Sequence, residues 1–293
     1  MQNTAAHTPD LLHTSQNGTA KRVDWVDYAK GLCIILVVMM HSTLGVEKAA
    51  GATGWLGTFV EFARPFRMPD FFLISGLFLA LVINRNWLRY FDRKVVHFFY
   101  FYILWVTIQF AFKAPVWLGE GASIGELALK YANVFIEPFG TLWFIYILPI
   151  FFIVTRLLKS LPWWALFAGA ALLQILPIHT GYLLVDEFSS RYVFFLAGYL
   201  FANKIFDIAD WLKANKATAL IFMALWAVIN GTIVFAPVPE FINQTMAVKS
   251  LADLPLVSLC LGGLGAFAII VASTLLSSLS FAGFLEYLGK HSI

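Results

Sequence analysis

The sequence predicts an all-α polytopic membrane protein, and three observations support that fold class. Of the 293 residues, 60% are hydrophobic and only 13% are charged, whereas soluble domains carry about 25% charged residues. The apolar residues gather in eight segments of 16 or more residues, close to the length that crosses about 30 Å of hydrocarbon as a helix. The segments lack the alternating pattern of a membrane β-barrel, so helices must satisfy their backbone polar groups.

The eight apolar segments predict eight transmembrane helices. Their approximate spans are 29–46, 68–83, 95–112, 139–158, 163–178, 191–206, 217–235 and 254–276. Residues 1–20 are polar and lack the basic and apolar regions of a signal peptide, so we expect a disordered tail there. Residues 21–293 then form a single membrane domain.

Cationic residues predict that the N-terminus is cytoplasmic. If eight helices alternate from a cytoplasmic start, 13 of the 20 Lys and Arg residues fall on the inner side, which is the sense that the positive-inside rule requires. The cluster from Arg85 to Lys94 is the strongest single indicator of this orientation. We therefore expect an integral membrane protein with a cytoplasmic N-terminus.

The first apolar segment carries a lysine at its mouth and a histidine near its far end. Lys30 and His41 are eleven positions apart, so on a helix they share a face and lie about 16 Å apart along the axis. Asp27 precedes Lys30 by one turn and is placed to pair with it. Because a polar group facing lipid costs several kcal/mol, we expect His41 to face the bundle interior or a wet cavity. Spacing alone favours a functional and a structural histidine equally, and a lysine at a helix mouth commonly snorkels.

The second segment is preceded by two arginines and contains a carboxylate. Arg64 and Arg67 are one turn apart, and Asp70 follows Pro69, a residue that is favoured in a first helical turn. These charges suit an anionic or hydroxyl-rich ligand. They equally suit a salt-bridge cluster with Glu61, and the sequence leaves both interpretations open.

The start of the third segment is a basic collar. Arg89, Arg93 and Lys94 lie within six positions. The collar satisfies the topology rule, and it would also hold the phosphates of a soluble anionic cofactor. Further on, Glu137 stands before the fourth segment and Trp143 lies inside it, where tryptophan is common as an interfacial residue.

The two cysteines and the histidines show no metal-site pattern. Cys33 and Cys260 fall in separate apolar segments, which is typical of small core residues rather than of a disulfide or a zinc site. His41 has no Cys, Asp or Glu at ligand spacing nearby. We therefore expect chemistry at His41 to need no metal.

Five stretches, taken in order, resemble motifs of the acyltransferase 3 family of integral membrane acyltransferases. "DYAKGLCIILVVMMH" resembles the family's Arg-x10-His signature, with a lysine in place of the arginine, and "MPDFFLISG" resembles its MP-x-FF-x-x-SG element. "TLWFIYILPIF", "RYVFFLAGYLFA" and "LEYLGKHSI" resemble the later motifs. The resemblance covers about residues 22–293 and is closest to sugar O-acetylase-like members.

The resemblance implies the activity and the site. Members have about ten membrane helices, so we expect a bundle truncated after the eighth, with the C-terminal helices missing. Members move acyl groups, such as acetyl or succinyl, from acyl-CoA to hydroxyls of envelope glycans such as exopolysaccharides or lipid-linked saccharides. His41 matches the essential histidine and Lys30 matches the arginine.

The leading hypothesis is thus a membrane O-acyltransferase with His41 as general base. Acyl-CoA would bind Lys30, Arg89, Arg93 and Lys94, and Asp27 would orient Lys30. The acceptor side would be lined by Arg64, Arg67, Asp70, Glu137 and Trp143. Two rivals remain open: a transporter or flippase of lipid-linked glycan with His41 as proton relay, and a non-catalytic membrane partner.

Overall fold

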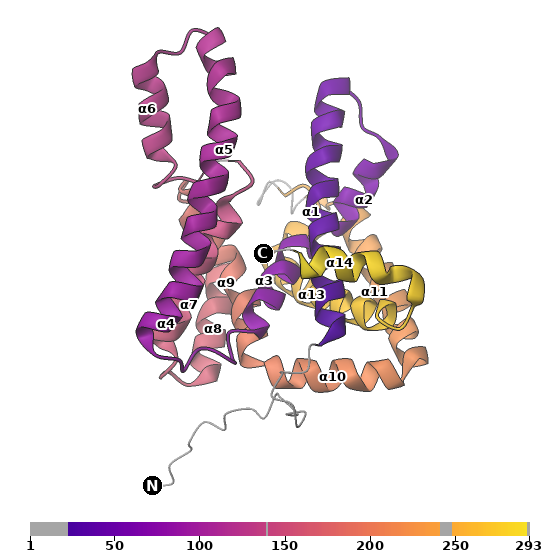
Figure 1. Ribbon diagram of the computed structural model, residues 1–293. Helices are drawn as coiled ribbons and strands as arrows, with labels where there is room; N and C mark the ends of the chain where they lie inside the picture. The colour runs from indigo at the N-terminus through magenta and orange to yellow at the C-terminus, as the bar shows by residue number, and fades with distance from the viewer. Residues whose placement is uncertain (1–22, 139, 241–247, 292–293) are drawn as a thin grey trace. The chain divides into compact units, whose positions relative to one another are not determined.

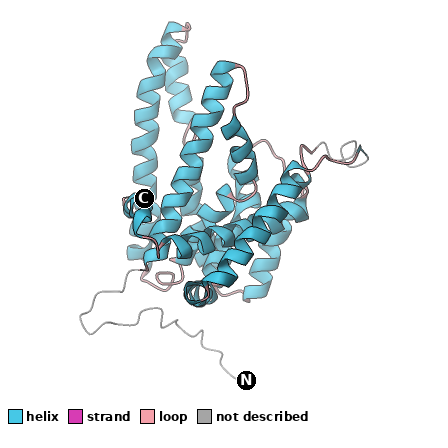
Figure 2. Ribbon diagram, turned by 90° about the vertical axis from the view of Figure 1, so that its right-hand side faces the viewer, coloured by secondary structure: helices cyan, strands magenta, loops and turns pink. Residues whose placement is uncertain are grey.

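Helices and the turns between them make up all the secondary structure in the part of the chain that the computed structural model describes, residues 23–138, 140–240 and 248–291 (Figure 2). The prediction of an all-helical chain is confirmed for these residues. The predicted tail, residues 1–20, lies outside them. The described helices fall into two compact units, one formed by residues up to 81 and from 194 onward, the other by residues 82–193.

Within the described residues, four helical stretches are long and apolar enough to cross a membrane. They are α1 (Asp24–Ala50), the stretch Trp87–Gly119, α11 (Lys216–Phe235) and α13 (Pro255–Leu276). A fifth candidate arises if α9 (Leu183–Leu200) and α10 (Ala202–Ala214) count as one bent span, and α7 (Trp143–Leu158) and α8 (Trp163–Ile175) are shorter apolar helices. The chain is therefore an integral membrane protein, while the count of eight transmembrane helices stays a prediction.

Two helices differ in extent from the predicted segments. The segment expected over 68–83 contains α3 (Arg67–Leu77), followed by turns. The segment expected over 191–206 is broken between α9 and α10, whose axes differ by 72°. The physical reason lies in α10, which buries Ile205 and Ala209 but exposes Lys204 and Asp207. Such a helix has one apolar and one charged face and does not suit continuation through hydrocarbon.

The first unit contains α1, α3, α10, α11 and α13, the end of α9, and four short elements. These are α2 (Trp55–Ala63), η2 (Leu251–Asp253), η3 (Ser280–Ala282) and α14 (Gly283–Lys290). Figure 1 shows α14 crossing α1. At this crossing Gly31 faces the backbone of Leu285, and Gly289 faces the backbone of Asp27. Glycine is required because a side chain at either position would overlap the opposing carbonyl group.

The second unit contains α4 (Trp87–Phe91), the π-helical turn η1 (Asp92–Val96), α5 (His97–Gly119), α6 (Ile124–Asn133), α7, α8 and the start of α9. α5 and α6 form a hairpin (Figure 1). A capping box between Ser123 and Glu126 begins α6. The buried hydroxyl of Tyr102 on α5 donates to the carbonyl of Val134 just after α6, which ties the two helices together.

Candidate functional site

One unbroken helix carries both Lys30 and His41. α1 runs for 27 residues without proline. Gly51 follows its last residue as the C-cap, and its positive φ of 65° is the left-handed conformation typical of that position. The helix is therefore continuous from Lys30 to His41, as the prediction that the two side chains share a face requires. Lys30 is half-buried, and its Nζ lies 5.4 Å from the ring centroid of Phe78. His41 is exposed on the described chain.

Asp27 is buried where α1 meets α14. Asp27 is 4% exposed, and Gly289 of α14 lies directly against the backbone of Asp27. The side chain is one turn before Lys30 in the same helix, the spacing that allows a helical ion pair. Its role in orienting Lys30 stays a prediction.

The first turn of α3 places a buried carboxylate and an arginine beside α1. Asp70 is 0% exposed, and its Oδ1 accepts the N–H of Phe71. The thiol of Cys33, on α1, lies near the carboxyl group of Asp70. Arg67 lies within electrostatic range of Asp70 and of His41. α3 packs against α1, so Arg67 and Asp70 lie on a helix that neighbours the helix of Cys33 and His41.

These side chains offer three kinds of chemistry. An imidazole can exchange a proton near neutral pH, a guanidinium can stabilise negative charge, and a buried carboxylate needs such a cation to offset its loss of hydration. Arg67 and Asp70 were predicted as site residues, and both lie on α3, which packs against the helix of His41. Their shared use with His41 stays a prediction.

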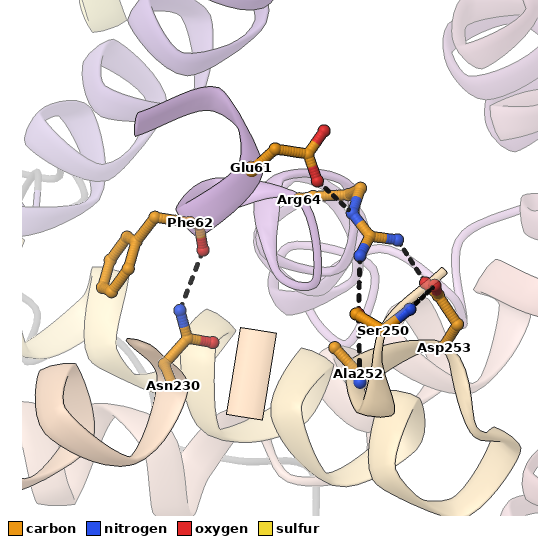
Figure 3. Close-up of polar contacts among 7 residues, drawn as sticks. All are labelled: Glu61, Phe62, Arg64, Asn230, Ser250, Ala252 and Asp253. Carbon is orange, nitrogen blue, oxygen red and sulfur yellow. Dashed lines mark hydrogen bonds and ion pairs between the residues drawn. The ribbon is translucent and has the colours of Figure 1, made fainter. Parts of the chain in front are cut away.

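Arg64 is engaged by protein oxygens. Its Nε donates to Oε2 of Glu61 at 2.9 Å, its Nη2 donates to Oγ of Ser250 at 2.8 Å, and its Nη1 donates to Oδ1 of Asp253 (Figure 3). The sequence left open a salt bridge with Glu61, and the structure contains that pair. Nearby, the buried side-chain amide of Asn230 donates to the carbonyl of Phe62 at 2.8 Å.

The remaining predicted site residues belong to the second unit. Arg89 and Arg93 are exposed on α4 and η1, and Nζ of Lys94 lies 4.8 Å from the ring centroid of Phe152. Glu137 is exposed in the turn that follows α6, and Trp143 is half-buried as the first residue of α7. Their shared use with Lys30 and His41 of the first unit stays a prediction.

Three residues of the first unit were not anticipated. Cys33 was expected to be an inert core residue, and no sequence signal indicates its contact with Asp70. Ser250 and Asp253 do carry a signal, since Ser-x-x-Asp before an apolar run is a helix-start pattern. The structure has that capping box at η2, just before α13.

Comparison with known proteins gives a family match and partial relatives. The model of the acyltransferase 3 family, described as an acyltransferase domain, matches residues 23–293. The chain is 28% identical over 229 residues to nodulation protein NolL of Sinorhizobium fredii, which is 76% of this chain and 60% of that protein. It is 27% identical over 192 residues to NolL of Mesorhizobium japonicum, 64% of this chain and 50% of that protein.

A third relative is the inner membrane protein YcfT of Escherichia coli, 27% identical over 166 residues, 49% of this chain and 46% of that protein. The chain therefore spans about half to three fifths of the length of the curated relatives that it matches. No solved structure matches it significantly.

Proposed function

The chain belongs to the acyltransferase 3 family, and on this basis we propose that it is a membrane-bound O-acyltransferase. It transfers an acyl group, acetyl or succinyl, from acyl-CoA to a hydroxyl of a cell-envelope glycan or lipid-linked saccharide. The observation that carries this proposal is the exposed imidazole of His41 within electrostatic range of Arg67, on the same helix as Lys30.

His41 acts as the general base. Its neutral imidazole takes the proton of the acceptor hydroxyl while that oxygen attacks the thioester carbonyl carbon. The tetrahedral intermediate then collapses, the carbon–sulfur bond breaks, and the departing thiolate takes the proton back from the imidazolium. The products are the O-acyl ester and free CoA. An imidazole suits this cycle because its ordinary pKa of about 6.5 lies near the working pH.

Cations at the cytoplasmic end hold the donor. Lys30 lies about 16 Å before His41 along α1, a separation that a pantetheine arm with its thioester can span. We assign Lys30, Arg89, Arg93 and Lys94 to the phosphates of CoA, with Asp27 orienting Lys30. The N-terminus is then cytoplasmic, where acyl-CoA is made.

Arg67 and Asp70 serve the acceptor side of the reaction. The guanidinium of Arg67 lies close enough to influence His41, so it can stabilise the oxyanion that forms on the thioester carbonyl. Asp70 offsets the charge of Arg67 before substrate binds. Glu137 and Trp143 are assigned to glycan binding as part of the same proposal.

Surface polysaccharide from a deletion strain tests this function in cells. The strain is complemented with the wild type or with His41→Ala at equal expression, and the acyl content of its glycans is measured by mass spectrometry. We expect acyl esters to be restored by the wild type alone. Restoration of the esters by both proteins, or by neither, would contradict the proposal.

A further inference from the structure

Arg64 has the contacts of a structural clamp. Each of the three nitrogens of its guanidinium donates to a separate protein oxygen, on Glu61, Ser250 and Asp253. Its side chain is 29% exposed, and those of Glu61 and Asp253 are 52% and 26% exposed. A planar guanidinium that meets three acceptors at once is held in one orientation.

The acceptors lie on two different parts of the chain. Glu61 belongs to α2, one turn before Arg64, whereas Ser250 and Asp253 bracket η2, which leads into α13 (Figure 3). The η2 side is itself braced, since Oδ2 of Asp253 accepts the N–H of Ser250 at 3.0 Å. Oγ of Ser250 also accepts the N–H of Ala252 at 3.2 Å. Arg64 therefore fastens the end of α2 to a preformed turn almost 190 positions away.

The same helix, α13, also meets Phe66, just before α3, and Pro69, in the first turn of α3. A Cβ at Gly265 would lie 2.2 Å from Cβ of Phe66, and a Cβ at Gly262 would lie 3.0 Å from Cγ of Pro69. Phe66 and Pro69 flank Arg67, and Asp70 follows directly. The first turn of α3, which carries Arg67 and Asp70, thus packs on α13 through the side chains of Phe66 and Pro69, and Arg64 fastens it there.

We propose that Arg64, Ser250 and Asp253 are positioning residues that hold Arg67 and Asp70 beside His41, and that Arg64 does not bind the acceptor itself. This inference rests on the proposed acyl transfer for its kinetic consequences. It replaces the substrate-binding role that the charge of Arg64 suggested in the sequence.

Removing the acceptor of the clamp separates the two roles. If Arg64 bound an anionic or hydroxyl-rich substrate, Asp253→Ala would free a cation and leave binding equal or tighter. If Arg64 positions Arg67, Asp253→Ala and Arg64→Ala have the same effect, because each opens the same clamp. A displacement of about 1 Å near reacting groups can cost up to about 100-fold in rate.

The experiment compares Arg64→Ala, Asp253→Ala and the double variant in purified full-length protein with labelled acetyl-CoA and acceptor glycan. We expect kcat to fall about 10- to 100-fold in each, the double variant to be no slower than the worse single one, and the KM for acetyl-CoA to stay within about twofold. Arg191→Ala is the matched control, because Arg191 is 27% exposed and pairs with one carboxylate, Glu187, within its own helix, α9. The control should keep wild-type kcat.

Thermal unfolding supplies a readout that does not depend on activity. The fall in Tm for the double variant should be clearly smaller than the two single falls added together, because both remove one interaction. Additive falls would overturn the clamp whatever the activity of the wild type. If the falls were not additive and the wild type turned over no acyl-CoA, the clamp would stand and the proposed function alone would fail. Wild-type kcat in Asp253→Ala with loss of acceptor binding in Arg64→Ala would overturn the positioning role while leaving the function intact. Asp253→Asn, which keeps the shape of the side chain, is the second variant if Asp253→Ala does not fold.

Discussion

The crossing of α3 and α9 allows a prediction with a calculable strain. A Cβ added at Gly76 would lie 2.0 Å from the carbonyl oxygen of Phe195 and 3.1 Å from the backbone nitrogen of Tyr199. Ordinary contact begins at 3.4 Å, so Gly76→Ala requires the two helices to separate by about 1.4 Å. Overpacking of this kind costs about 1–3 kcal/mol, more than the roughly 0.8–1 kcal/mol that alanine gains over glycine in a helix.

The consequence should reach the site, since α3 also carries Arg67 and Asp70 in its first turn. In detergent, we expect Gly76→Ala to lower Tm by about 2–10 °C and to lower kcat at least tenfold. Gly263→Ala in α13 is the control, because nothing lies within 4 Å of its added Cβ, and it should be neutral or slightly stabilising. If Gly76→Ala matched Gly263→Ala in both Tm and kcat, the close crossing would not support the site as described.

Three further predictions test separate parts of the molecule. Lys30→Ala should raise the KM for acyl-CoA about tenfold or more, since a hydrogen bond to a charged group is worth about 1.5–3 kcal/mol. Lys30→Arg should keep this KM near the wild-type value. Equal KM values for the wild type and Lys30→Ala in steady-state assays would refute the role of Lys30 in binding the donor. Hydrogen bonds from the N–H and hydroxyl of Ser123 lower the pKa of Glu126, so the cap stabilises α6 above the ordinary carboxyl pKa of about 4.3 and is lost as pH falls through the lowered value. Hydrogen exchange of α6 against pH should show this loss, and Glu126→Gln, which removes the titratable carboxyl group, should abolish the pH dependence. Asn230→Ala removes a buried donor to the carbonyl of Phe62 and should cost about 1–3 kcal/mol by thermal unfolding; an unchanged Tm would count against that bond.

The sequence predicted best what depends on local pattern. The all-helical class follows from apolar runs, and α1 follows from an uninterrupted one, so the shared helix of Lys30 and His41 was predictable. Pro69 correctly marked the first turn of α3. The pairing of Arg64 with Glu61 was also within reach, because an interval of three positions joins them on one helical turn.

What the sequence could not supply depends on distant contacts. Asp253 meets Arg64 across 189 positions, and no periodicity in a single chain specifies such a partner. The contact between Cys33 and Asp70 is hidden for the same reason. The break after Leu200 escaped hydropathy because the buried face of α10, with Ile205 and Ala209, continues the apolar run while its charged face turns outward. A hydropathy average over both faces does not detect that change.

Single-turnover acyl transfer by purified protein tests the central claim most directly. Wild type and His41→Ala are mixed with labelled acetyl-CoA and acceptor glycan, and the rate of ester formation is followed at saturating donor. A general base at His41 predicts that the variant loses about 10²- to 10⁴-fold in rate while its KM for acetyl-CoA stays within about twofold. Ester formation at the wild-type rate in His41→Ala would show that this imidazole does not take the proton, and the proposed mechanism would be wrong.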